Sequence, residues 1–324
     1  MGRAGFEPAA NALKGHCSTT ELTTRAGANT PIISQVPRAS RRRAFRLIEW
    51  GVMPAESPSP SAAVTAVPAV WTFPALGALP GVVHGMTLRS GGVSAAPFDS
   101  LNLGLHVGDD PASVLENRRR AALAFGHSLD ALTCAEQVHG GHVARVTAAD
   151  AGRGARRFAD ALPGADALVT DSTDVLLALF FADCVPVFLA DREGRGVGVA
   201  HAGWRGLVAG VVEATVRAMR DELGVPAERL LAAVGPSIGP GAFEVGEEVA
   251  ARFPRSTVRE GDGPPRVDLW RETALRLRDA GVPEGQITVA GVCTTADSER
   301  WFSHRRDGGR TGRMGAFIGL RRSP

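Results

Sequence analysis

The chain has 324 residues, of which 44% are hydrophobic and 22% are charged, and its formal net charge is +2. This composition is typical of a globular protein of one large or two ordinary domains, and so small a net charge gives no argument for a nucleic-acid or membrane partner. No apolar run approaches the ~20 residues of a membrane helix, and the four cysteines, at positions 17, 134, 184 and 293, are widely spaced. That spacing favours reduced thiols and a cytoplasmic protein over a disulfide framework.

Residues 1–78 differ in composition from the rest of the chain. They contain the only lysine, Lys14, a basic run at Arg41–Arg43, and a stretch rich in Pro, Ser and Ala over Pro54–Pro68. Such a segment offers too little apolar surface to offset the entropy of ordering. We therefore expect a disordered or non-native N-terminal extension over 1–78, with translation beginning near Met53, and a single catalytic domain over 79–324.

The first elements of the expected domain have clear start and stop signals. Val83–Arg89 is typical of a strand, and it leads into the glycine-rich turn Ser90–Gly92. Asp110 and Pro111 are typical of an N-cap and a first helical position, and Gly126 is a suitable end for that helix.

The remaining elements mix strands and helices without regular alternation. Three apolar runs in the middle of the chain predict buried strands. Because some consecutive strands lack a helix between them, the pattern predicts an α/β (α+β) layered sandwich with mixed β-sheets. The expected strands are 138–146, 166–170, 175–181, 185–190, 196–200, 230–234 and 287–292, the last of the clear strands, and the expected helices are 208–223, 243–253 and 268–280.

Polar residues stand where the central strands break. Cys184 lies between two of the apolar runs, and His201 follows the third. A thiolate and imidazoles are zinc ligands, and a catalytic zinc site uses three protein ligands with one position open. His139 would complete the set, and His142 is its rival. The alternative is that Cys184 is a small buried hydrophobic residue.

The same residues allow a second chemistry. Cys184 could be a nucleophile with His201 as its base, as in cysteine hydrolases, and Asp183 would then orient the base.

Two glycine-rich turns contain arginines that could bind an anion. Arg89 precedes Gly91, and Arg205 lies in the run Gly203–Gly206 at the start of an expected helix. Backbone N–H groups beside an arginine suit phosphate, although such turns are commonly only turns. The run 301–307, rich in Arg with Ser and His beside aromatics, either contacts an anion or a stacked base, or is a solvated turn.

Taken together, these stretches resemble one family. The matching motifs occur in the family's order and cover about residue 82 to the end of the chain. They are LRSGGVS (88–94), SLNLGLHVGDD (100–110), VLENR (114–118), EQVHG (136–140), ADALVT (165–170), ADCVP (182–186), HAGWRG (201–206), VGPSIGP (234–240), CTT (293–295), FSHRRD (302–307) and TGRM (311–314). The chain is thus similar to the YfiH/laccase-domain family, also called multicopper polyphenol oxidases, peptidoglycan editing factors or purine nucleoside phosphorylases of the FAMIN type.

The resemblance implies a zinc site made by His139, Cys184 and His201, which selects His139 over His142. It also implies a single-domain sandwich similar to a toxin deamidase fold. The implied activity is phosphorolysis of adenosine, inosine and S-methyl-5′-thioadenosine, with adenosine deamination as a second activity. The alternatives are a cysteine hydrolase or amidase acting on peptidoglycan precursors, a copper-dependent polyphenol oxidase, and a non-enzymatic binding protein.

For that chemistry we assign roles as hypotheses. Asp183 would carry the proton in deamination, and Arg89, Arg205 and His304 would hold phosphate. Asn102 would contact the sugar, unless it closes its own turn. The expected partners are purine nucleosides and phosphate, without nucleic acid or membrane, for a monomer or small homo-oligomer with zinc, or less favourably copper, as cofactor.

Overall fold

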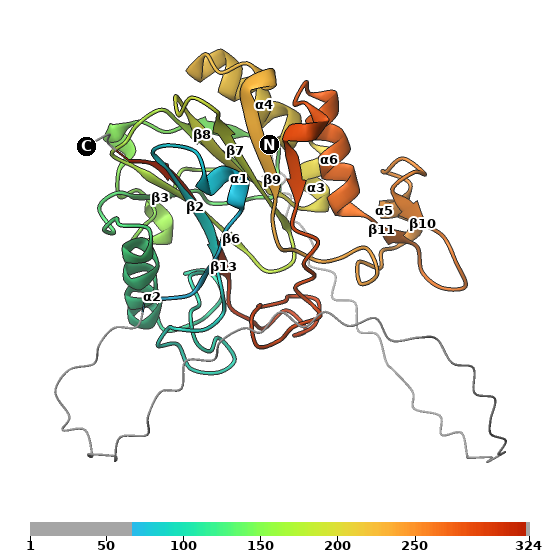
Figure 1. Cartoon of the computed structure of the whole chain (residues 1–324). Coiled ribbons are helices and arrows are strands. Elements are labelled where there is room, and N and C mark those ends of the chain that lie inside the picture. Colours follow the sequence, from blue (N-terminus) through green and yellow to red (C-terminus); the bar gives the residue numbers. More distant parts are fainter. Residues whose placement is uncertain (1–66, 322–324) are drawn as a thin grey trace, which may run out of the picture. The chain divides into compact units, whose positions relative to one another are not determined.

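The computed structural model describes residues 67–321, which form two mixed β-sheets with helices on their outer faces (Figure 1). The five-stranded sheet has the order β1-β2-β13-β6-β3, formed by Val70–Trp71, Val82–Thr87, Met314–Leu320, Leu176–Phe181 and Leu132–Cys134. The six-stranded sheet has the order β12-β9-β7-β8-β5-β4, formed by Ile287–Val289, Leu230–Val234, Val185–Asp191, Val197–Ala202, Ala167–Thr170 and Val143–Arg145. Val258–Arg259 (β10) and Arg266–Val267 (β11) pair as a separate two-stranded sheet.

The helices of the described part are short or medium in length. They are Pro74–Gly77 (α1), Pro111–Ala124 (α2), Trp204–Val208 (α3), Val211–Leu223 (α4), Glu247–Ala250 (α5) and Leu269–Asp279 (α6). Single 3₁₀ turns lie at Ala148–Asp150, Phe158–Asp160, Ala227–Arg229 and Glu284–Gln286. Within residues 67–321 no helix combines the length and the apolar character needed to cross a bilayer.

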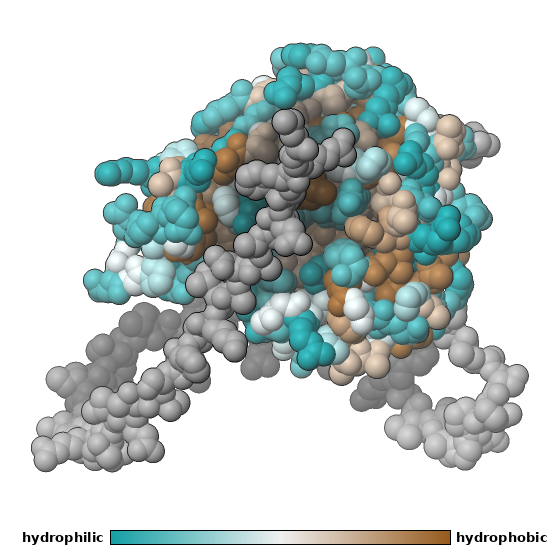
Figure 2. All heavy atoms as spheres, turned by 180° about the vertical axis from the view of Figure 1, so that it is seen from behind, coloured by the Kyte–Doolittle hydropathy of each residue, from teal (hydrophilic) through white to brown (hydrophobic). Residues whose placement is uncertain are grey.

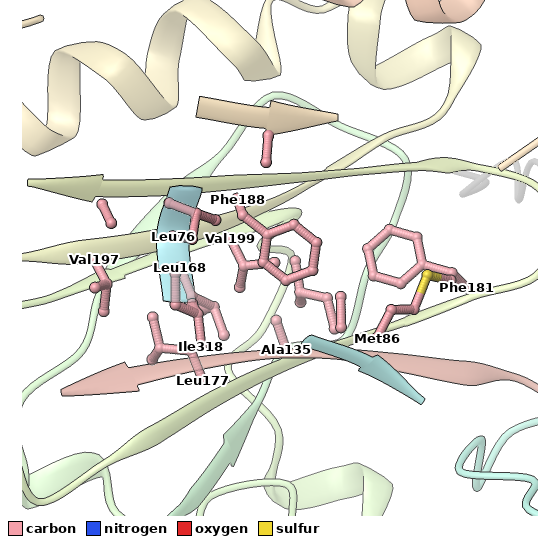
Figure 3. Packing of buried hydrophobic residues seen from close by; sticks show 14 of the residues in the cluster. Leu76, Met86, Ala135, Leu168, Leu177, Phe181, Phe188, Val197, Val199 and Ile318 are labelled. Carbon is pink, nitrogen blue, oxygen red and sulfur yellow. The ribbon is translucent and has the colours of Figure 1, made fainter. Parts of the chain in front are cut away.

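The two sheets pack face to face around the central core. Side chains from β2, β6 and β13 meet side chains from β5, β7 and β8, and Figure 3 shows them between the two layers of strands. Residues that alternate along a strand point to opposite faces. Accordingly, Leu177, Leu179 and Phe181 of β6 join the central core, whereas Leu176, Ala178 and Phe180 join the outer cluster that contains residues of α2.

A third cluster fills the outer face of the six-stranded sheet. There, residues of β7, β8 and β9 pack against the apolar faces of α4 and α6, including Val212, Met219 and Leu277. The layers therefore run helix, sheet, sheet, helix, and the predicted layered sandwich with mixed sheets is confirmed. The layer of α4 and α6 follows from amphipathic sequence patterns of period 3.6, whereas the buried face of α2 also includes the polar residues Asn117 and Arg118.

Several predicted elements differ from the structure at their ends. The expected helix 243–253 is wrong over most of its length, because the backbone of Phe243 and Glu244 pairs with the β11 region and only α5 is helical. The helix expected after the run 203–206 is divided into α3 and α4 at Gly210, whose φ is +80°. Helix α1 and the strands β1, β3, β10, β11 and β13 were not predicted from the sequence.

The domain boundary expected at residue 78 lies inside the folded part. β1 pairs with β2 in antiparallel register, and Phe73 and Leu76 are buried in the central core. The predictions for residues 1–66, including the start near Met53, lie outside the described residues.

The described surface mixes hydrophilic and hydrophobic residues, as the view from behind shows (Figure 2). Its exposed large hydrophobic residues are separated along the chain, which is normal for a folded protein. They are Val67, Val93, Leu123, Val138, Phe158, Val208 and Val289.

One core histidine makes the stability of the fold depend on pH. Nε2 of the buried His84 accepts a hydrogen bond from the Phe73 amide at 2.8 Å, so the ring is neutral. Burial lowers the pKa of His84 to about 4, and an Nε2 that accepts from the amide also favours the neutral ring.

We expect the free energy of unfolding to fall as the pH drops from about 6.5 towards 4, because the unfolded chain then binds a proton at His84 that the folded chain excludes. The loss from this one group is about 3 kcal/mol. His84→Gln, which keeps an acceptor for the Phe73 amide but does not titrate, should flatten the curve measured by urea unfolding. Parallel curves for the two proteins would contradict the assignment.

Candidate metal centre

The β7–β8 hairpin brings two of the predicted ligands together. The strands pair in antiparallel register with Pro186 opposite His201. Cys184 lies two residues before Pro186, immediately ahead of β7, so that it is a diagonal neighbour of His201. His201 is on the same face of β8 as Val197 and Val199, which belong to the central core. The site therefore lies at one end of the layer between the two sheets.

The third ligand comes from a loop. His139 lies between β3 and β4, with its backbone in the left-handed region at φ +62°. One nitrogen or sulfur atom from each of His139, Cys184 and His201 lies within 4.8 Å of the others, and Nε2 of His139 is 3.9 Å from Sγ of Cys184. These spacings fit a common metal ion, and one thiolate with two imidazoles is a donor set that zinc accepts. His142 is not part of this group.

The charges of the three groups are coupled. Burial raises the pKa of the Cys184 thiol, but the two imidazoles together outweigh burial and lower it well below its usual value. Burial lowers the pKa of His201, but Cys184 and Asp166 outweigh burial and raise it. The thiolate is the form that binds a metal.

Close packing of glycine backbone makes room for this group. A Cβ at Gly203 would lie 2.9 Å from Sγ of Cys184 and 3.2 Å from the His139 ring. A Cβ at Gly206 would meet the carbonyl oxygens of His201 and Gly140. A side chain at position 203 or 206 would therefore crowd the site, which explains why both positions are glycine.

A cavity of about 440 Å³ opens over the three residues. Its lining combines aromatic and cationic side chains, several of which the sequence reasoning did not single out. Besides the three candidate ligands it includes His106, Gln137, Phe180, Ala182, Asp183, Trp204, Arg205, Ile238, Phe243, Leu269, His304, Arg305 and Arg313.

Of the four residues predicted to bind phosphate or sugar, two line this cavity. Arg205 and His304 do, and both are exposed. The structure does not bring Arg89 there, because its guanidinium donates to the carbonyl and carboxylate of Asp99 and to the carbonyl of Ser298. Asn102 is fully buried and does close its own turn, with its amide bonded to both backbone groups of Gly104.

Asp183 lines the cavity, but its carboxylate already has several donors. Oδ1 accepts from the Thr294 hydroxyl at 2.6 Å, and Oδ2 accepts from the Ser303 hydroxyl and from the backbone N–H of Arg305. These bonds hold the C-terminal loop beside the turn that carries Cys184. The role of Asp183 as a proton carrier stays a prediction.

Two arginines of the cavity that the sequence did not lead us to assign, Arg305 and Arg313, come from the C-terminal part of the chain. The guanidinium of Arg305 lies 5.3 Å from the ring centre of Phe243. The assigned Arg205 makes the same kind of contact, with its guanidinium 4.3 Å from the ring centre of Trp204. Arg313 donates to the carbonyls of Thr311 and Gly312. The motifs FSHRRD and TGRM contained the available signal, since they placed Arg305 and Arg313 beside His304 in sequence.

Comparisons with known proteins agree with this geometry. A family described as multi-copper polyphenol oxidoreductase laccase matches residues 83–321. Purine nucleoside phosphorylase YlmD of Geobacillus stearothermophilus is 44% identical over 255 residues, which cover 74% of this chain and 91% of the relative. Purine nucleoside phosphorylase YfiH of Escherichia coli is 40% identical over 247 residues, covering 74% and 94%.

Solved structures show the same fold. The crystal structure of YlmD from Geobacillus stearothermophilus superposes with a TM-score of 0.73 at 42% identity, covering 77% of this chain and 94% of that one. Protein NMB0706 of Neisseria meningitidis gives a TM-score of 0.67 at 35% identity, covering 79% and 99%. Together with the motifs and their order, these matches show that the chain belongs to the multi-copper polyphenol oxidoreductase laccase family, which includes the YlmD and YfiH proteins.

Proposed function

We propose that the chain is a zinc-dependent purine nucleoside phosphorylase. It would cleave adenosine, inosine and S-methyl-5′-thioadenosine with phosphate to the free base and the (methylthio)ribose 1-phosphate, with adenosine deamination as a side activity. The names of the relatives support the reaction class. The observation that carries the proposal is the His139–Cys184–His201 group on the wall of a cavity that also contains exposed arginines.

The donor set favours zinc over copper. Copper electron-transfer sites add a weak axial methionine to two histidines and a cysteine, but no methionine of residues 67–321 lines this cavity. Met86, Met219 and Met314 are buried in the hydrophobic cores. Within residues 67–321 this is also the one group of three such ligands, whereas a multicopper oxidase needs several metal sites.

When bound, zinc would supply Lewis-acid character at the wall of the cavity. The chain's own residues would do the rest by positioning. In phosphorolysis a phosphate oxygen forms a bond to C1′ of the sugar while the bond from C1′ to the purine nitrogen breaks, and its electron pair leaves with the base.

The two stacked arginines are suited to hold phosphate. Trp204 and Phe243 support the guanidinium groups of Arg205 and Arg305 by cation–π contact, which limits their orientations before an anion arrives. Among residues 67–321 no carboxylate forms an ion pair with either arginine, so both charges are available for an anion. The aromatic lining, which includes Phe180, offers apolar surface to a purine.

A cysteine hydrolase is the second candidate, and one observation favours it. Nδ1 of His201 is 2.8 Å from Oδ1 of Asp166, which gives a Cys–His–Asp arrangement with Asp166 in the role predicted for Asp183. Substrates of that class, such as peptidoglycan precursors, would be cleaved by the metal-free protein. Turnover that survives complete metal removal would favour this alternative.

Phosphorolysis is tested with purified protein, zinc, adenosine and phosphate. We expect adenine and ribose 1-phosphate, detected by chromatography. Cys184→Ala should lower turnover by more than the 10–100-fold that is usual for loss of an outer-shell partner of a metal site. Cys134→Ala is the matched control, because that thiol is buried in the core beside α2. Equal turnover by Cys184→Ala and the parent would refute the metal mechanism.

The metal site itself is tested by mass spectrometry of the purified protein, for which we expect one zinc ion per chain. Gly203→Ala should lower zinc content, because the added Cβ would meet Sγ of Cys184 at 2.9 Å. Gly241→Ala, where a Cβ meets no atom within 4 Å, should retain zinc. Copper in place of zinc would support the oxidase alternative.

The assignment of the phosphate site is tested by steady-state kinetics. Arg205→Gln and Arg305→Gln should each raise the KM for phosphate about 10-fold to 100-fold, the effect of losing one charge-assisted hydrogen bond. Arg89→Gln should leave that KM unchanged, because Arg89 is bound to Asp99 outside the cavity. The reverse pattern would restore the role that the sequence suggested for Arg89.

A further inference from the structure

One buried carboxylate connects two of the three candidate ligands. Asp166 immediately precedes β5 and is fully buried. Its side chain accepts from the backbone N–H groups of Val138, His139 and Gly140 at 3.1, 2.9 and 2.6 Å. The same carboxylate accepts from Nδ1 of His201 at 2.8 Å. Three consecutive amides of one loop and one imidazole on a neighbouring strand therefore share a single acceptor group.

The backbone that Asp166 binds is in a conformation that needs support. In the described part of the chain only three non-glycine residues have positive φ: Gln137, His139 and Asp183. All three line the cavity. A left-handed backbone at a non-glycine residue persists only where its surroundings fix it. At His139 those surroundings are the carboxylate oxygens of Asp166, which engage its own N–H and those of both neighbours.

The bond to His201 fixes which nitrogen is free for a ligand. Because Oδ1 of Asp166 accepts at Nδ1, the proton of the neutral ring is on Nδ1, and Nε2 is left as the acceptor nitrogen. The backbone reinforces this arrangement, since the His201 N–H donates to the Asp166 carbonyl at 2.7 Å. A carboxylate behind a histidine ligand sets ring orientation and raises ligand basicity.

We infer that Asp166 is a positioning residue that builds the metal site before the ion arrives, by fixing the loop of His139 and the tautomer of His201 together. This inference rests on the metal site proposed above. A carboxylate that served the fold alone would support β5 and leave metal affinity unchanged. Asp191 provides that comparison, since it is fully buried at the end of β7 and accepts from Arg229 and Arg195.

The test compares Asp166→Asn with Asp191→Asn in the full chain. Zinc affinity is measured by competition with a chromophoric chelator, and amide hydrogen exchange is measured on the metal-free proteins. Asp166→Asn should bind zinc about 10-fold to 100-fold more weakly. It should also exchange the amides of residues 138–140 faster, because one carboxylate oxygen is replaced by an NH₂ group that cannot accept. Asp191→Asn should retain the parent's zinc affinity even if it unfolds more easily.

The outcomes separate this inference from the metal proposal. If the parent protein binds no zinc, the metal site is wrong and Asp166 has no such role. If the parent binds zinc and Asp166→Asn binds it equally well, the positioning role is refuted. Should Asp166→Asn fail to fold, nitrogen-15 NMR of the zinc-loaded parent decides. A proton on Nδ1 of His201 supports the inference, and a proton on Nε2 overturns it.

Discussion

The register between β7 and β8 is the constraint on which the site depends. With Pro186 opposite His201, Cys184 and His201 share the face that closes one end of the central core. A shift of one residue would turn His201 to the opposite face of the sheet, where α4 packs. The shift would also turn Val197 and Val199 of β8 out of the central core, so the same hydrophobic pattern that stabilises the sandwich fixes the position of His201.

Around this hairpin, two buried carboxylates hold the loops that strands cannot position. Asp166 binds the loop of His139, and Asp183 binds the C-terminal loop that contains His304 and Arg305. Each carboxylate is distant in sequence from the groups that it binds. The hydrogen bonds of these two carboxylates therefore need both sheets to be assembled. A buried carboxylate without these donors would be strongly unfavourable. The site is in this sense a consequence of tertiary folding.

The parts of the fold that the sequence predicted well are those with a local signal. Runs such as 175–181 and 185–190 could be assigned from apolar content, and α2 from Asp110 and Pro111 at its start. β13 has no such signal, since its three small residues, Gly315, Ala316 and Gly319, weaken the apolar pattern. It is nevertheless the central strand of its sheet, where pairing with β2 on one side and β6 on the other outweighs its low intrinsic strand propensity.

At the site, the types of residue could be predicted from the sequence. Whether their hydrogen-bonding atoms already have partners within the protein could not. Arg89 and Asn102 have side chains suited to a phosphate and a sugar, yet their polar atoms are bonded within the protein. Arg205 and His304 have the same kind of side chain but are exposed on a cavity wall. A hydrogen-bonding group binds a ligand well only when its own partners do not already occupy it. The division between polar residues that build a site and polar residues that act in it is therefore a property of the folded chain.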